Sequence, residues 1–289
     1  MKKEMHITGV FALLVFSAVS IFTSCSSAPK NTGDVYTLRA QAEAGLESGS
    51  REAGQGNFEN ALILLTESKR KAILADDPSL TVRVCLARGN VLFFLGRTEE
   101  AFAEWELAVA EARGFGNGEL LSLSRIYRAR GMLISGRAEA QSVLDEVNRE
   151  SANIKSERIY IAFSWQVKGL ALRALGSYAE AENALRRSLE INEREKVLEN
   201  ASYDWYIIAS IRSLQGNTTD AITALEASIS IDRRIENSWG LAASWRAMGD
   251  VYRRAGMEQE AVEAYRRAIT IYTAMGNERE VAETEKRMN

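Results

Sequence analysis

The sequence predicts an all-α solenoid built from about six helix-turn-helix repeats. Three observations carry this prediction. The 289 residues include only two prolines, and long stretches are rich in Ala, Leu, Glu and Arg, which is typical of helices. Hydrophobic residues make up 46% of the chain, enough for a full core. Glycine recurs at intervals of 40 residues, and each copy carries a similar pattern of small and apolar residues.

Residues 1–24 have the layout of an export signal. Two lysines precede an uncharged apolar run over residues 7–23, and small residues lead to Cys25. The cysteine after "FTS" resembles the lipobox of bacterial lipoproteins, with Phe22 where leucine is usual. That resemblance implies that Cys25 is the first mature residue and carries the acyl chains. An uncleaved transmembrane anchor and a plain secreted protein are the alternatives, and the apolar run is barely long enough to span a bilayer.

Residues 25–37 are expected to form the lipidated cysteine and a flexible tether, because they are small, polar and turn-forming. Loss of residues 1–24 removes His6, the only histidine, and leaves Cys85 as the only other cysteine. The mature chain then has no Cys/His metal cluster, no histidine general base and no disulfide between free thiols. We therefore expect no cofactor, no bound metal and no catalytic residues.

Six glycines mark the turns inside the predicted repeats. Five residues after the glycine comes alanine in five copies, nine residues after it a large apolar residue, and twelve after it a small one. Because these offsets differ by four and three, the residues share one helical face. In the third copy Ala140 comes one position early and Leu144 follows it, as if the turn were one residue shorter. The glycines are Gly56, Gly96, Gly136, Gly176, Gly216 and Gly256.

The first helix of each unit has a pattern of its own. A bulky residue stands eleven positions before the glycine and a small residue seven before it. The bulky residue is Trp165, Trp205 or Trp245 in three units, and Cys85 takes this place in the second unit. The spacing indicates that the tryptophans belong to the core and that the small residues let a neighbouring helix approach. Cys85 is expected to be a buried structural thiol rather than a reactive one.

Gly176, in "ALGSYAEAENAL", could either open a phosphate-binding loop or end a helix. Its five periodic relatives favour a helix end, where a left-handed residue satisfies the last carbonyls and glycine avoids a Cβ clash. Ser177 and Glu180 would then form a capping box at the next helix. No G-x-x-x-x-G-K-[ST] motif is present. Turns such as "RGFGNGE" and "TAMGNERE" would separate one repeat from the next.

Within "WRAMGDVYRRAGMEQEAVEAYRRA" the spacing of aromatic and small residues resembles a tetratricopeptide (TPR) repeat. The residues that fall on the family pattern are Trp245, Gly249, Tyr252, Gly256, Ala261, Tyr265 and Ala268. The period of 40 residues rather than 34 resembles a subclass of the family, and the proline that usually closes the second helix is missing. The resemblance implies a right-handed superhelix of six repeats over residues 38–277. A capping helix over residues 278–289 would follow.

The resemblance also implies a partner-binding groove along the concave face, lined by the first helix of each repeat. The positions concerned lie one, two, five and eight residues after the tryptophan position. Their mixture of aromatic, amide and arginine side chains suits a peptide or a partner's helix, although these side chains could also be merely solvated. The positions carry Asn90, Phe93, Tyr127, Arg130, Gln166, Leu170, Arg173, Tyr206, Ser210, Arg246, Asp250 and Arg253.

These expectations combine into a function. The protein would be a non-enzymatic, membrane-anchored TPR scaffold lipoprotein of the bacterial cell envelope, on the periplasmic or outer-membrane face. It would bind a protein or peptide in its groove, in the assembly of an envelope complex. A transport accessory that docks on a periplasmic substrate-binding protein is the alternative, and a hydrolase that uses carboxylates alone is a third class. The net charge of −3 gives no electrostatic case for nucleic acid, and no small-molecule ligand is expected.

Overall fold

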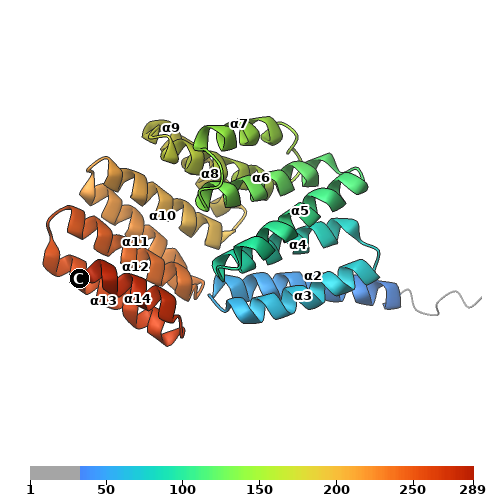
Figure 1. The fold of residues 1–289 in the computed structure, drawn as a ribbon, viewed down its shortest axis with the longest axis horizontal. Helices are drawn as coiled ribbons and strands as arrows, with labels where there is room; N and C mark the ends of the chain where they lie inside the picture. Colours follow the sequence, from blue (N-terminus) through green and yellow to red (C-terminus); the bar gives the residue numbers. More distant parts are fainter. Residues whose placement is uncertain (1–32) are drawn as a thin grey trace, which may run out of the picture.

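The computed structural model describes residues 33–289 as thirteen α-helices, with no strand in that range (Figure 1). The predicted signal peptide and Cys25 lie outside the described residues. The all-α repeat fold is confirmed. The helices are α2 (Gly33–Gly54), α3 (Phe58–Leu74), α4 (Pro78–Phe94), α5 (Thr98–Gly114), α6 (Gly118–Ile134), α7 (Ala140–Ser151), α8 (Arg158–Ala174), α9 (Tyr178–Arg194), α10 (Leu198–Leu214), α11 (Thr218–Arg234), α12 (Ser238–Arg254), α13 (Glu258–Ala274) and α14 (Glu278–Met288).

The 40-residue period consists of two helices and two short turns. Helices α8, α9 and α10 each have 17 residues and begin at Arg158, Tyr178 and Leu198, so that a helix starts every 20 residues. The same spacing holds from α3 to α6 and from α8 to α13. At the N-terminus, α2 begins at Gly33, so the last part of the tether expected over residues 25–37 is helical.

The glycine turn inside each pair stops the first helix as expected. Gly176 has φ +78°, and its N–H donates to the carbonyl of Arg173 at 3.0 Å. The N–H of Ser177 donates to the carbonyl of Leu172 at 3.0 Å, which completes a Schellman motif. The predicted capping box is wrong, because the side chain of Ser177 makes no capping hydrogen bond and its backbone is turned away from the extended conformation that capping needs.

The turns between repeats use the same left-handed geometry, and three of them use it without glycine. Asp76, Lys196 and Glu236 have φ values of 49°, 60° and 58°. Gly116 and Gly276 occupy the equivalent position in two other turns. A left-handed residue therefore occurs at most of the 20-residue intervals. The sequence reveals these turns only where the left-handed residue is a glycine.

The third repeat departs from the others. Its second helix, α7, has only 12 residues and begins at Ala140, so the turn before it is longer than in the other repeats, and the predicted shorter turn is wrong. Val143 and Val147 are the buried apolar residues of α7, whereas Leu144 is half-buried. The pattern is thus shifted two residues later rather than one residue earlier.

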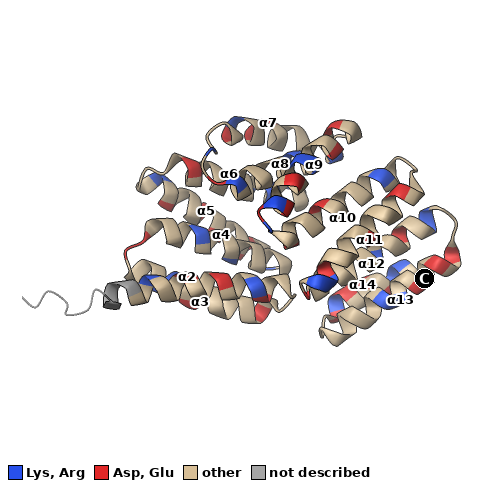
Figure 2. Cartoon of the chain, turned by 180° about the vertical axis from the view of Figure 1, so that it is seen from behind, with Lys and Arg blue, Asp and Glu red and all other residues tan. Residues whose placement is uncertain are grey.

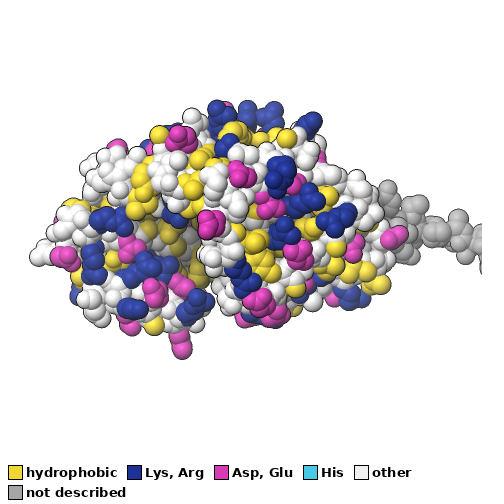
Figure 3. All heavy atoms as spheres, turned by 45° about the horizontal axis from the view of Figure 1, so that its top comes forward, with side chains coloured by type: hydrophobic (Ala, Val, Ile, Leu, Met, Phe, Trp, Pro, Cys, Tyr) yellow, Lys and Arg dark blue, Asp and Glu magenta, His cyan; other side chains and the backbone are white. Residues whose placement is uncertain are grey.

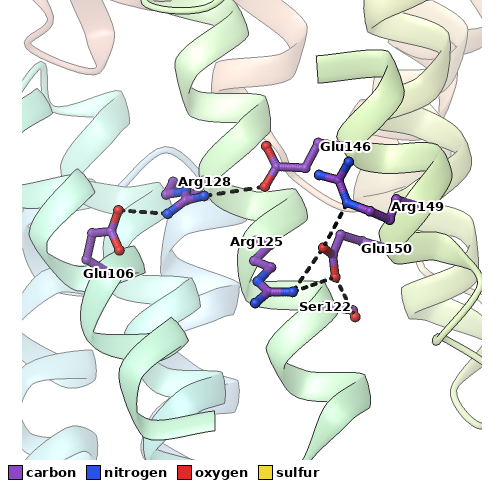
Figure 4. Close-up of polar contacts among 7 residues, drawn as sticks. All are labelled: Glu106, Ser122, Arg125, Arg128, Glu146, Arg149 and Glu150. Atoms are coloured by element: carbon purple, nitrogen blue, oxygen red, sulfur yellow. Dashed lines mark hydrogen bonds and ion pairs between the residues drawn. The ribbon is translucent and has the colours of Figure 1, made fainter. Parts of the chain in front are cut away.

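A buried carboxylate explains how this irregular helix is held in place (Figure 4). Glu150 is 3% exposed and accepts hydrogen bonds from Ser122 Oγ at 2.8 Å and from Arg125 Nη1 at 3.0 Å. Arg128, also on α6, forms an ion pair with Glu146 at 3.3 Å. Because Glu150 stands where the regular repeats have a small residue, its partners on α6 replace the close packing found elsewhere.

Close packing between the two helices of a repeat depends on the small residues of the first helix. A Cβ atom added at Gly169 would lie 2.6 Å from Leu185 Cγ, and one added at Gly249 would lie 2.6 Å from Tyr265 Cδ1. A Cβ atom at Gly89 would collide with Trp105 in the same way. The large residue of each second helix therefore sits directly over a gap in the first helix.

The tryptophans of the first helices are not core residues, which corrects the prediction. Trp165, Trp205 and Trp245 are only half-buried. Arginines of the outer helices cover two of them, with Arg187 Cζ 4.6 Å from the centre of the Trp165 ring and Arg267 Cζ 4.5 Å from that of Trp245. These contacts shield the rings from water while leaving the guanidinium groups solvated.

Cys85 occupies the tryptophan position of its repeat and is completely buried. Burial raises the pKa of its thiol to about 12. A thiol that stays protonated at neutral pH is a poor nucleophile, as expected of a structural cysteine.

The first and last repeats meet, so that the solenoid closes on itself (Figure 1). Trp239, at the start of α12, packs edge-on against Phe58 at a centroid distance of 5.1 Å and against Phe94 at 6.0 Å. The ring centre of Tyr272, on α13, lies 5.6 Å from that of Trp239. We call Phe58, Phe94, Trp239 and Tyr272 the closure contact. Figure 2, from behind, also shows the N-terminal helices beside α12 and α14.

Candidate binding groove

The first helix of each repeat lies on the inner side of the curved solenoid. Helices α2, α4, α6, α8, α10, α12 and α14 each contact the next one in this series, whereas the second helices make no comparable contacts with one another in the described part of the chain. Helices that approach one another in this way form the shorter, concave side of a superhelix. We call this series the inner helices and the others the outer helices.

All twelve predicted groove residues lie on inner helices, but three of them are buried. Arg130, Gln166 and Leu170 are 8%, 3% and 5% exposed, so the prediction is wrong for Gln166 and Leu170, whereas the Nη atoms of Arg130 still reach solvent. The remaining nine have intermediate exposure. These are Asn90, Phe93, Tyr127, Arg173, Tyr206, Ser210, Arg246, Asp250 and Arg253.

Gln166 is buried because it serves a carboxyl group of the next inner helix. Its Nε2 donates to Asp204 Oδ1 at 2.9 Å, and Asn192 Nδ2 donates to Asp204 Oδ2 at 2.8 Å. Burial raises the pKa of Asp204 to about 7, against the opposing effect of these hydrogen bonds. Gln166 is therefore part of a structural network between α8, α9 and α10.

The predicted groove residues of the last repeat are bonded to α14, which partly covers them. Arg246 pairs with Glu280 at 2.5 Å, and Arg253 Nη2 donates to the carbonyl of Met288 at 2.6 Å. Asp250 accepts a hydrogen bond from Arg287 Nη1 at 2.8 Å. The terminal helix thus docks as one more inner helix and bonds the polar side chains of α12.

Phe93 and Tyr127 belong to a hydrophobic cluster in the N-terminal half. The Phe93 ring lies 5.7 Å from that of Trp105, and Tyr127 stacks on Phe163 at 4.1 Å. Both residues are partly buried against the core there. The structure therefore does not bring them together with the groove residues of α10 and α12.

A pocket of about 360 Å³ opens between α8, α10 and α12. It brings together four predicted groove residues, namely Arg173, Tyr206, Ser210 and Asp250. Figure 3 shows the surface hollowed beside the C-terminal helices, with basic, acidic and hydrophobic side chains around the hollow. This pocket is the candidate site.

The pocket also contains Ser213 and Arg254, which the sequence reasoning missed. Ser213 occupies in α10 the position that Arg173 has in α8, so the 40-residue spacing could have found it. Arg254 lies four residues after Asp250 and therefore on the same face of α12. Its position in the last turn of the helix is the signal that could have identified it.

Hydroxyl groups, rather than carboxylates, hold the two arginines of the pocket. Arg173 Nη1 donates to Ser210 Oγ at 2.6 Å, and Arg254 Nη1 donates to Ser213 Oγ at 2.6 Å. Neither guanidinium forms an ion pair with any residue of the described range 33–289. Asp250, the acid in the pocket, accepts hydrogen bonds from Tyr265 OH and from Arg287.

Two stacked tyrosines connect the pocket to a third arginine. Tyr206 lines the pocket and stacks on Tyr203 at a centroid distance of 6.0 Å. The guanidinium carbon of Arg130, on α6, lies 5.8 Å from the centre of the Tyr203 ring. Arg130, Tyr203 and Tyr206 thus form a line from α6 to the pocket.

Comparison with known proteins agrees with this geometry. Residues 201–274 and 164–195 match two sequence models of the tetratricopeptide repeat. The chain is a tetratricopeptide repeat protein. No curated protein matches this TPR chain significantly.

Solved structures of other proteins share this fold over most of the length of the TPR chain. A Rap protein complexed with competence and sporulation factor has a TM-score of 0.59 and 13% identity, over 100% of this chain and 87% of that one. Aspartyl phosphate phosphatase F from Bacillus subtilis has a TM-score of 0.56 and 14% identity, over 78% of this chain and 59% of that one. At such identities the likeness shows the fold alone.

Two further features bear on the kind of site. In the described part of the TPR chain, no group of three His, Cys, Asp or Glu residues is arranged to hold a metal ion. Over the same residues, no helix has the length and apolar character needed to cross a membrane. Figure 2 shows acidic and basic residues on most helices of the described chain, with both signs present in both halves of the solenoid.

Proposed function

We propose that this TPR protein is a non-catalytic scaffold that binds a protein or peptide partner at the pocket between α8, α10 and α12. The observation that carries the proposal is the convergence of Arg173, Tyr206 and Arg254 in one concave pocket. Tyrosine and arginine contribute most often to the energetic centres of protein interfaces. The similar fold of a Rap protein complexed with a factor supports the proposal.

We further propose that the scaffold is attached to a membrane of the bacterial envelope by a lipid on Cys25. The signal layout and the lipobox-like sequence before Cys25 support this. A lipid anchor would hold the solenoid on the periplasmic or outer-membrane face, where a partner in the assembly of an envelope complex would reach its inner helices.

Metabolic labelling tests the anchor. Cells that express the full chain are grown with a radioactive fatty acid, and the purified protein is expected to carry the label. The Cys25→Ala variant is expected to lose it. Label that survives this substitution, or an unlabelled parent protein, would overturn the lipid attachment.

Site-directed crosslinking tests the binding face. A photo-crosslinking amino acid at Ser210, in the pocket, is expected to capture a partner from membranes at near-stoichiometric yield. The same amino acid at Glu190, exposed on outer helix α9, serves as the matched control. Equal capture at both positions would contradict the pocket as the binding face. Capture of a periplasmic substrate-binding protein would redirect the proposal from envelope assembly to a transport accessory.

A matched pair of tyrosine substitutions separates binding from folding. Tyr206→Ala removes an aromatic side chain from the pocket, whereas Tyr178→Ala removes one from outer helix α9. We expect the first variant to weaken partner capture at least tenfold while both variants keep the helical circular dichroism of the parent. Equal capture by the two variants would remove the pocket from the proposal.

A further inference from the structure

Two arginines that line the pocket, and a third that lies beyond the stacked tyrosines, form no ion pair with a carboxylate of the described chain. Arg173 and Arg254 bond to the hydroxyls of Ser210 and Ser213. Other arginines of the inner helices behave differently, since Arg246 pairs with Glu280 at 2.5 Å. The third, Arg130, makes no hydrogen bond or ion pair within residues 33–289, and its Nε is enclosed without a partner.

Arg130 is mostly buried, but its terminal nitrogens still reach solvent. The residue is 8% exposed, and Nε is the side-chain nitrogen that is enclosed without a partner, so the two Nη atoms remain accessible. The guanidinium carbon lies 5.8 Å from the centre of the Tyr203 ring. Because charges interact more strongly where water is partly excluded, a carboxylate that reaches these Nη atoms is expected to bind more strongly there than at a fully solvated arginine.

Asp250, the acidic residue of the pocket, does not neutralise Arg173 or Arg254. The carboxylate of Asp250 accepts hydrogen bonds from Tyr265 OH and from Arg287, both at 2.8 Å. Asp250 is therefore balanced by Arg287, and the positive charge of Arg173 and Arg254 remains. The chain as a whole has a net charge of −3, so this local excess of cations is a feature of the pocket.

We propose that the partner segment is an acidic peptide, with carboxylates that bind Arg173 and Arg254 in the pocket and a further carboxylate that binds Arg130. This inference rests on the proposed binding function and specifies its ligand class. The planar guanidinium matches a carboxylate with two parallel hydrogen bonds, and such charge-assisted bonds are stronger than those to serine hydroxyls. Tyr203 and Tyr206 would contact the peptide between its acidic groups.

The line from the pocket to α6 favours a peptide over a single small anion. Arg130 and the pocket arginines are separated by the stacked pair of Tyr203 and Tyr206, whose centroids are 6.0 Å apart. One phosphate or one free carboxylate cannot reach both ends of this line. An extended peptide advances by about 3.3 Å per residue and can place acidic side chains at each end.

Fluorescence anisotropy with defined peptides tests the proposal on the full-length, detergent-solubilised protein. The probes are fluorescein-labelled hexaglutamate, hexaglutamine and hexalysine. We expect hexaglutamate to bind at least tenfold more tightly than hexaglutamine, with an affinity that falls as salt is raised. Equal binding of hexaglutamate and hexaglutamine would overturn the proposal. Competition by inorganic phosphate at the same concentration as the peptide would overturn it in favour of a small-anion site.

Arginine variants locate the binding. Arg173→Gln and Arg130→Gln are each expected to weaken hexaglutamate binding about tenfold or more, and Arg130→Lys to retain part of it. Arg194→Gln, on an exposed position of α9, is the matched control and should bind like the parent. Thermal unfolding of every variant separates loss of binding from loss of fold. An Arg194→Gln effect as large as that of Arg173→Gln would overturn the assignment.

A competition experiment separates this inference from the proposed function. If the Ser210 crosslinker captures a partner that hexaglutamate does not displace, the binding function stands and the acidic ligand class is wrong. If hexaglutamate binds through Arg173 but no partner is captured, the ligand class stands and the scaffold function is wrong.

Discussion

At the scale of single residues, two buried carboxyl groups couple the fold to pH. Asp204 and Asp232 are completely buried. Burial raises the pKa of Asp204 to about 7 and that of Asp232 to about 6. An unfolded aspartate titrates near 4. Between pH 4 and 7 the folded protein therefore holds protons that the unfolded chain releases.

This difference fixes the direction of a pH effect. Because the folded state binds more protons in this window, the free energy of unfolding is expected to decrease as pH rises from about 4 to about 7, through these two groups. Asp204→Asn removes one of these groups, so the free energy of unfolding of the variant should fall by about 2–4 kcal/mol less between pH 4 and pH 7. Urea unfolding of parent and variant at several pH values measures the slope. Glu190→Gln, an exposed substitution, is the control, and a variant slope equal to that of the parent would contradict the assignment.

At the scale of the helix and its turn, left-handed residues terminate the helices with and without glycine. Lys196 and Glu236 hold φ values near 60° and are exposed. A non-glycine residue in this conformation costs about 1–2 kcal/mol relative to its favoured regions. Gly176 holds φ +78° at no such cost, and a Cβ there would have no neighbour within 4 Å.

Opposite substitutions at these turns should therefore have opposite effects on stability. Lys196→Gly is expected to raise the free energy of unfolding by about 0.5–1 kcal/mol, since relief of the left-handed strain exceeds the added entropy of the unfolded chain. Gly176→Val is expected to lower it by about 1–3 kcal/mol. Chemical unfolding measures both. If Lys196→Gly destabilises the protein, the turn at Lys196 is not strained.

The pattern of elements could be predicted where a residue type reports the backbone directly. Gly176 and its relatives marked the turns because glycine alone is free of strain there, and Leu185 and Gly169 marked the seam because their sizes are complementary. The turn at Lys196 could not be found in this way, since tertiary packing imposes a conformation that its side chain does not favour. In α7 the buried Glu150 requires partners from α6, which local spacing cannot reveal.

The candidate site could be predicted only in part for a related reason. Repeat spacing identified the helix face that carries Tyr206 and Ser210. It could not show that Gln166 turns inward to Asp204, because that depends on a carboxyl group of the next repeat. Nor could it show that α14 covers Arg246, since the docking of a terminal helix depends on the curvature of the whole array.

At the scale of the whole molecule, the closure contact restrains the curvature of the solenoid. Trp239 joins residues of the first repeats to residues of the last, and Phe58 beside it is 7% exposed. Solenoids otherwise contact only neighbouring repeats and flex easily along their length. We therefore expect the contact to hold the inner helices at one curvature and to keep the candidate pocket in one shape.

Trp239→Ala is expected to open the molecule. Loss of the indole removes its aromatic contacts with Phe58 and Phe94, and the two phenylalanine rings become more exposed to water. The predicted result is a larger radius of gyration in small-angle X-ray scattering and a free energy of unfolding lower by about 1–3 kcal/mol, because Trp239 is half-buried. Trp165→Ala, which removes a half-buried tryptophan far from the closure contact in sequence, is the control. An unchanged radius of gyration for Trp239→Ala would show that the contact does not set the curvature.

The meeting of the two ends also limits how this protein can evolve. An open array can gain or lose a repeat unit by duplication or deletion, because each unit touches only its neighbours. Here an extra 40-residue unit would carry Trp239 past Phe58, and a missing one would leave them apart. We therefore expect the closure contact to restrict the number of repeats that this fold can hold. Homologues that keep an aromatic pair at these two positions are expected to keep the same repeat number.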